Sequence, residues 1–133
     1  MQTIIDNKKV SLYYHADTKI VHHVYHRGIG GRELKEALNA GVDLLKQHRA
    51  TKWLSDNRAI DAHTEDETTW INTVWLPNAI EAGWKFWSLV VPEDFKARIN
   101  MVEFVNEFYE RGVRVMVFTD PDEGMAWLEQ VNT

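Results

Sequence analysis

Apolar and polar residues alternate most clearly near the start of the chain, where they predict two adjacent strands. Aromatic and β-branched residues fill positions 10–15 and 20–25, and the polar, turn-forming segment 16–19 separates them. Two short strands joined by such a turn are typical of an antiparallel hairpin. A glycine-rich segment at 28–31 then ends the strand pattern.

The hydrophobic period lengthens after residue 31, from two to between three and four residues. Apolar residues recur at this spacing within the segment 32–48, at Leu34, Leu38, Val42 and Leu45. The spacing predicts an amphipathic helix. A short strand is predicted at 52–56.

A second helix is predicted from its start signal. Thr64 and Glu67 have the spacing of a capping box, in which each side chain accepts a hydrogen bond from the backbone N–H of the other residue. One broad face beyond the box is apolar: Trp70, Ile71, Val74 and Trp75. Proline disfavours helical backbone at the residue before it, so Pro77 is expected to kink or restart the helix. Gly83 is expected to end it.

Two further segments, 85–91 and 113–118, are nearly continuous apolar sequence, as expected of strands covered on both faces. A helix is predicted between them, over 94–111. Its inward residues are expected to be Met101, Val105 and Phe108, with Val102, Phe104 and Tyr109 beside them. Asp120 and Pro121 supply a cap and a first-turn proline for a last helix.

The predicted order of elements is β-β-α-β-α-β-α-β-α. Strands that alternate with helices connect by right-handed crossovers and form a mostly parallel sheet with helices packed on it. The predicted fold is therefore α/β, with a mostly parallel sheet and an antiparallel N-terminal hairpin. At 133 residues, the chain is expected to form a single domain over 1–133.

Composition narrows the classes of function. Fifteen Lys and Arg residues stand against twenty Asp and Glu residues, and the basic residues are dispersed, whereas nucleic-acid binding needs a basic stripe. Cysteine is absent, which excludes disulfide scaffolds and thiolate chemistry. No signal peptide is visible and no apolar run reaches the length of a membrane span, so we expect a cytoplasmic protein. Tryptophan is unusually frequent, with six residues.

The glycine segment 28–31 lies between a strand and a helix, where a phosphate could bind. A dinucleotide fingerprint needs a third small residue at the position of Glu33, and the lysine of a P-loop is also missing. We interpret the segment as a tight turn, for which glycine is the default residue.

Histidines gather on the opening hairpin. His22 and His26 point the same way along a strand but lie about 13 Å apart, too far to share one zinc ion. His15 and His22 can approach across the hairpin, yet no carboxylate is placed to complete a site. We predict that these histidines, with His23, are packed or solvated, and that the chain holds no metal and no cofactor.

No arrangement of residues points to catalysis. The serines are Ser11, Ser55 and Ser88, and the sequence places no general base beside any of them. The carboxylates of Asp61 and Glu65 lie at a helix start, where the helix dipole explains them. The chain is predicted not to be an enzyme and to have no catalytic residue.

The strongest candidate site follows the strand at 52–56. Asp56, Asn57 and Arg58 leave the carboxyl end of that strand, which is where open α/β sheets bind ligands. Trp70 and Trp75 on the next helix could complete a ligand pocket or an interface with a partner. The alternative is that the tryptophans fill the core and that Asp56 ties down the loop.

The residues also resemble a known family. The segment 52–58, Lys-Trp-Leu-Ser-Asp-Asn-Arg, resembles the strand-and-loop signature of small bacterial STAS-like proteins, the SpoIIAA-like group, which is grouped with the CRAL-TRIO type of lipid-binding domain. The match extends over nearly the whole chain, through segments 75–79, 83–85, 89–92, 117–120 and 126–128. The resemblance implies a sheet with helices, a cytoplasmic setting, and binding instead of catalysis.

The resemblance also directs attention to one regulatory position. Anti-sigma antagonists of the wider family carry a phosphorylatable serine, preceded by Asp, at the start of the helix after the third strand. The corresponding segment here, 61–64, reads Asp-Ala-His-Thr and lacks that pair. Thr64 is the candidate phosphosite, because the N-terminus of a helix favours the added negative charge.

Three hypotheses about function follow. The leading one is a non-enzymatic, STAS-like regulatory module that recognises a protein partner or a small apolar ligand. The first alternative is a lipid or apolar-ligand carrier of CRAL-TRIO type, which requires a pocket of about several hundred Å³. The second is a metal-dependent enzyme that uses histidine and carboxylate. A homodimer is left open, since the opening hairpin leaves an edge for pairing.

Overall fold

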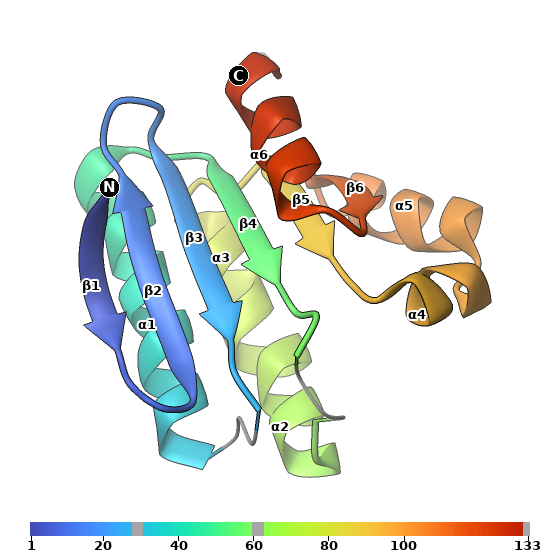
Figure 1. Cartoon of the computed structure of the whole chain (residues 1–133), viewed down its shortest axis with the longest axis horizontal. Coiled ribbons are helices and arrows are strands. Elements are labelled where there is room, and N and C mark those ends of the chain that lie inside the picture. Colours follow the sequence, from blue (N-terminus) through green and yellow to red (C-terminus); the bar gives the residue numbers. More distant parts are fainter. Residues whose placement is uncertain (28–30, 60–62, 132–133) are drawn as a thin grey trace.

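One six-stranded sheet organises the computed structural model, which describes residues 1–27, 31–59 and 63–131 (Figure 1). The strands lie in chain order: β1 (Gln2–Asp6), β2 (Val10–His15), β3 (Ile20–Tyr25), β4 (Lys52–Asp56), β5 (Phe86–Val90) and β6 (Arg114–Phe118). The first three strands pair antiparallel, and β3 to β6 pair parallel. The predicted α/β fold with an antiparallel N-terminal hairpin is confirmed.

The sequence pattern does not predict β1. Four of its five residues are exposed and only Ile5 is partly buried, whereas the alternation that signals a strand requires one buried face. β1 pairs along β2, so the edge expected beside the opening hairpin is covered. The two outer strands of the sheet are β1 and β6.

Helices cover the two faces of the sheet unequally. Their bounds are α1 (Gly31–His48), α2 (Glu65–Trp70), the π-helix η1 (Ile71–Trp75), α3 (Leu76–Glu81), α4 (Glu93–Arg98), α5 (Met101–Glu110) and α6 (Pro121–Gln130). α1 and α3 lie behind the sheet in Figure 1, where they share the largest apolar core with β2, β3 and β4, and α6 crosses the front face over β4 and β5. None of the helices in the described part of the chain is long and apolar enough to cross a lipid bilayer.

The predicted second helix begins and restarts where expected. Thr64 Oγ1 accepts from the Glu67 N–H at 3.2 Å, and the Glu67 carboxylate accepts from the Thr64 N–H at 2.8 Å, which completes the capping box. The helix then widens into η1, and α3 starts with Pro77 in its first turn. Gly83 ends this region at φ +113°, a backbone conformation that suits glycine.

The helix predicted over 94–111 is wrong in one respect, because it is two helices. Ile99 takes an extended backbone after α4, and Asn100 then caps α5 by accepting from the Glu103 N–H at 3.2 Å. The orientation expected for two residues of α5 is also wrong. Val102 is 70% exposed and Tyr109 is 66% exposed, since only the face that carries Phe104 and Phe108 packs on the sheet.

Candidate functional site

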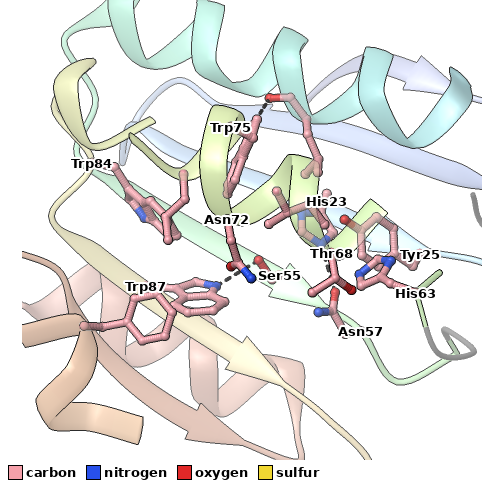
Figure 2. Close-up of a pocket in the computed structure, with 14 residues that line it drawn as sticks. His23, Tyr25, Ser55, Asn57, His63, Thr68, Asn72, Trp75, Trp84 and Trp87 are labelled. Atoms are coloured by element: carbon pink, nitrogen blue, oxygen red, sulfur yellow. Dashed lines mark hydrogen bonds between the residues drawn. The ribbon is translucent and has the colours of Figure 1, made fainter. Parts of the chain in front are cut away.

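A pocket lies under alternate side chains of three neighbouring parallel strands. His23 and Tyr25 of β3, Ser55 of β4 and Trp87 of β5 share the sheet face that α1 and α3 cover, since residues two apart on a strand point the same way. Between this face and the layer formed by α2, η1 and α3 lies a pocket of about 220 Å³ (Figure 2). Asn57 also lines it, at the carboxyl end of β4, the end at which open α/β sheets bind ligands.

Four aromatic rings form one wall of the pocket: Trp75, Trp84, Trp87 and Phe108. The centroids of successive rings lie 5.5, 5.3 and 5.0 Å apart, and their planes are tilted by about 60 to 70°. Offset or edge-to-face rings at such distances attract one another. Trp53 supports the wall from beneath, wholly buried, with its ring centroid 5.3 Å from that of Trp75. The wall is therefore a rigid apolar surface.

The protein itself uses the N–H groups of the wall. Trp75 Nε1 donates to the Leu38 carbonyl at 2.8 Å, and Trp84 Nε1 donates to the Phe86 carbonyl at 3.1 Å. An indole has one donor and no acceptor. These two rings therefore offer the pocket apolar surface and no further hydrogen bond.

Trp87 is held by a side chain of the neighbouring strand. Its Nε1 donates to Ser55 Oγ at 2.9 Å, and Ser55 is buried (Figure 2). On its other side the ring packs against Phe104 and Phe108 of α5, with centroids 5.9 and 5.0 Å away. Trp87 thus connects the polar floor of the pocket with α5.

His23 lies at the centre of a fixed hydrogen-bond chain. Trp53 Nε1 lies 2.9 Å from His23 Nδ1, and His23 Nε2 lies 2.9 Å from Asn57 Oδ1. Because an indole only donates, Nδ1 is the acceptor and Nε2 carries the proton that is donated to Asn57. Burial lowers the pKa of His23 to about 4, so the ring is neutral at pH 7. Both ring nitrogens are engaged, and the role of His23 is to orient Asn57.

Tyr25 closes the pocket beside His23. Its ring stacks on the imidazole with the centroids 4.2 Å apart, and the residue is almost fully buried. Burial, with a smaller contribution from the nearby Glu67 carboxylate, raises the pKa of Tyr25, so its hydroxyl keeps its proton. His63 meets the other side of the Tyr25 ring edge-on.

One carboxylate caps two helices next to this site. Glu67 Oε1 accepts from the Thr64 N–H at 2.8 Å, and Oε2 accepts from the Gly31 N–H at 2.7 Å. These backbone hydrogen bonds lower the pKa of Glu67. The first N–H of α1 therefore donates to a carboxylate of the protein itself. The rest of the glycine segment that was interpreted as a tight turn, residues 28–30, lies outside the described residues. The contact with Gly31 has no local signal, since 36 residues separate the two.

The structure separates the five residues that the sequence grouped into one site. Asn57 and Trp75 line the pocket. Asp56 points to the other face of the sheet. There Arg58 donates two hydrogen bonds of 2.9 Å to it, from Nε to Oδ1 and from Nη2 to Oδ2. Trp70 packs at the margin of the core, with Lys35 Nζ 5.3 Å from its ring centroid.

Other predicted positions have structural partners. The Thr64 hydroxyl, the candidate phosphosite, is the cap of α2. Asp61 lies outside the described residues, and Glu65 is exposed in the first turn of α2. Ser88 donates to the Gly124 carbonyl at 2.8 Å inside the core.

The histidines of the hairpin approach one another as expected. His15 Nε2 lies 3.1 Å from His22 Nδ1, and burial together with the His15 charge lowers the pKa of His22 to about 4. Within residues 1–27, 31–59 and 63–131, no group of three or more His, Cys, Asp or Glu side chains is placed to hold a metal ion.

Several pocket residues are not among the site residues that the sequence predicts: His23, Ser55, Trp84, Trp87 and Phe108. Trp87 is only partly buried. The register of the sheet brings His23, Ser55 and Trp87 together. His23 pairs with Ser55 across β3 and β4, and Trp53, two residues before Ser55, pairs with Trp87 across β4 and β5. Such pairing across strands is not encoded in the local pattern of any one strand.

Comparison with protein-family models finds no matching model, and comparisons with curated proteins and with solved structures find no match either. The geometry of the pocket therefore carries the functional argument.

Proposed function

We propose that this chain is a non-enzymatic binding module whose pocket holds a small, largely apolar aromatic molecule. One observation carries the proposal. Three indoles and a phenyl ring line the pocket, and none of its described lining residues is Asp, Glu, Lys or Arg. Ligand sites typically combine an apolar, aromatic lining with a few polar groups that fix orientation.

The size of the pocket supports a ligand of one or two rings. A cavity of about 150 Å³ binds benzene, and pockets for drug-sized ligands start near 300 Å³. The volume here, about 220 Å³, lies between them. It is smaller than the several hundred Å³ required of a lipid carrier, so a small ligand is favoured over that alternative.

The state of the polar groups supports binding over catalysis. His23 is neutral and has both nitrogens engaged, so it cannot accept a proton from a substrate without breaking a buried hydrogen bond. Ser55 accepts from an indole, and no histidine is hydrogen-bonded to it among the described residues. An activated nucleophile needs such a base.

We also propose that the chain is related to the STAS-like proteins and acts as a cytoplasmic module. The segments that carry this resemblance supply the pocket: Ser55 and Asn57 come from 52–58, and Trp75 and Trp84 come from 75–79 and 83–85. The module is also proposed to recognise a protein partner, and the bound ligand would then regulate that interaction.

Titration with ethylbenzene tests the pocket. The indole N–H groups of the six tryptophans serve as probes in ¹H–¹⁵N NMR, and the signals of Trp75, Trp84 and Trp87 should shift as ethylbenzene binds. Trp87→Leu removes one of the four rings of the wall. It should raise the dissociation constant by about tenfold, which corresponds to the free energy of about one buried aromatic contact. Trp127→Leu is the matched control, since Trp127 packs on the opposite face against Phe86 and Phe118.

Two results would contradict the proposal. One is the absence of any shift at the three pocket indoles up to the solubility limit of ethylbenzene. The other is equal weakening by Trp87→Leu and Trp127→Leu, which would place binding elsewhere or attribute the loss to general destabilisation.

A further inference from the structure

Two polar side chains at the floor of the pocket, Ser55 and Asn57, leave hydrogen-bond donors unused (Figure 2). Each indole N–H of the wall is already bonded, and so are both nitrogens of His23. Around the floor, His63, Thr68 and Asn72 supply further polar atoms, and Nδ1 of His63 is buried with no partner among the described residues.

Ser55 has a proton to give. A hydroxyl offers one donor and two acceptor positions. Ser55 Oγ accepts from Trp87 Nε1, and no acceptor for its own proton is found among the described residues. The residue is 5% exposed and lines the pocket, so this proton is available to a molecule that occupies the pocket.

Asn57 has two protons to give. Its Oδ1 is fixed as the acceptor, because His23 Nε2 must donate to it. The amide nitrogen is therefore the free end, and no acceptor for it is found in the described part of the chain. Ser55 lies in β4, and Asn57 follows the strand two residues later. Both sets of donors therefore lie on the same side of the pocket.

None of the described residues that line the pocket carries a charge that could balance a charged ligand. Its two histidines are neutral at pH 7, since burial lowers the pKa of His23 to about 4 and lowers that of His63. Placing an unpaired ion in such surroundings is strongly unfavourable. A carboxylate would have suitable acceptors but no cation beside it, and an ammonium group would face donors.

We propose that the ligand is a neutral, planar aromatic molecule whose hydrogen-bond acceptor, a carbonyl oxygen or an unprotonated ring nitrogen, faces Ser55 and Asn57. The inference rests on the proposed function and adds the class of ligand. The rings of the wall bind the aromatic body, and the two side chains of β4 fix its orientation. His63, Thr68 and Asn72 supply further polar side chains of the lining.

Four probes of similar size test the class: acetophenone, ethylbenzene, benzoate and benzylammonium. Acetophenone carries the neutral acceptor, ethylbenzene has none, and the last two are an anion and a cation. Titration by ¹H–¹⁵N NMR on the full chain should give acetophenone a dissociation constant about five- to tenfold lower than that of ethylbenzene, the effect of one net hydrogen bond. Benzoate and benzylammonium should bind more weakly than ethylbenzene.

Two variants assign the donors. Asn57→Asp keeps an oxygen for His23 but removes the amide protons, and it should weaken acetophenone by about five- to tenfold more than ethylbenzene, so that the selectivity between the two probes is lost. Asn106→Asp, the same change on the exposed face of α5, is the matched control. Ser55→Ala tests the second donor, and its folded fraction is read from the same spectra.

The outcomes separate the two levels of the argument. If no probe shifts the pocket indoles, both the proposed function and this inference are overturned. If ethylbenzene binds as tightly as acetophenone, or if either ion binds more tightly, the pocket stands as a binding site and the neutral acceptor is refuted. Loss of acetophenone selectivity in Asn57→Asp or in Ser55→Ala, with the control unchanged, supports the assignment.

Discussion

The contact between Gly41 and Trp53 gives the sharpest test of the packing described above. Gly41 lies in the middle of α1 and faces the indole of Trp53. A Cβ added to Gly41 would lie 2.0 Å from Cη2 of that ring and less than 3 Å from Cζ2 and Cζ3. Carbon atoms pack at about 3.5 to 4.0 Å. Gly41→Ala therefore requires a movement of more than 1 Å.

The indole has no room to make that movement. Trp53 is fully buried, its Nε1 donates to His23, and its ring stands edge-on to Trp75. Overpacking of a core costs about 1 to 3 kcal/mol, and loss of the buried hydrogen bond costs about 1 kcal/mol more. Replacement of glycine by alanine in a helix returns about 1 kcal/mol. We expect Gly41→Ala to lower the free energy of unfolding by about 1 to 3 kcal/mol.

Gly124→Ala is the matched control in α6. There the added Cβ would meet Phe118, Ser88 and Leu54 at 3.3 to 3.5 Å, contacts that a shift of a few tenths of an ångström relieves. The gain in helix propensity should offset this strain, leaving stability within about 1 kcal/mol of the parent. Urea unfolding followed by circular dichroism measures both variants. A Gly41→Ala protein as stable as the parent would refute the packing argument.

Three further predictions concern charge and capping. Because the pKa of His23 is about 4 in the fold and 6.5 when unfolded, its contribution to stability is complete above pH 6.5 and is lost as the pH falls toward 4. Burial lowers the pKa of His22 to about 4 as well, so both histidines act in the same direction. The free energy of unfolding from urea titrations should therefore be lower at pH 4.5 than at pH 7 by a few kcal/mol, and His23→Gln should remove about half of that difference. Glu67→Gln weakens the caps of both α1 and α2 and should cost about 1 to 2 kcal/mol, whereas Glu65→Gln, on the exposed side of α2, should cost less than about 0.5 kcal/mol in the same unfolding assay. Arg58→Ala leaves the buried Asp56 carboxylate without its partner and should lower the free energy of unfolding by about 1 to 3 kcal/mol, a range that allows for solvent screening because the Arg58 side chain is half exposed. The affinity for ethylbenzene should stay unchanged. A loss of affinity would show that Arg58 contributes to the pocket.

Local patterns were sufficient where one residue's environment depends on its near neighbours. The spacing of Leu34, Leu38 and Leu45 predicted α1, and the Thr64–Glu67 capping box marked the start of α2. The edge strand β1 was not predicted, because almost all of its residues are exposed and its sequence shows no alternation of apolar and polar residues. Asn100 was missed as a cap because the apolar periodicity continues on both sides of it, and only the backbone turn at Ile99 shows that the helix stops.

The pocket required information that no local pattern holds. Ser55 and Trp87 are 32 residues apart and meet because β4 and β5 are neighbours in register. Asp56 and Asn57 are adjacent in the chain, yet they serve opposite faces of the sheet, so the sequence could group them only by proximity. The choice between a core role and a pocket role for Trp75 depended on where η1 places it, which is a tertiary outcome.

The π-helix at Ile71–Trp75 lets the chain carry one extra residue between α2 and α3. Its hydrogen bonds span five residues, one more than in an α-helix. A wide turn of this kind absorbs the extra residue locally, so the helix before it and the helix after it keep nearly the register that they would have without it. Deleting one exposed residue, such as Thr73, should therefore return the segment to the ordinary winding and leave Leu76 facing the core, whereas a deletion in the regular helix α1 would rotate everything after it by about 100°. The segment between α2 and α3 is thus expected to tolerate a change in length that α1 does not.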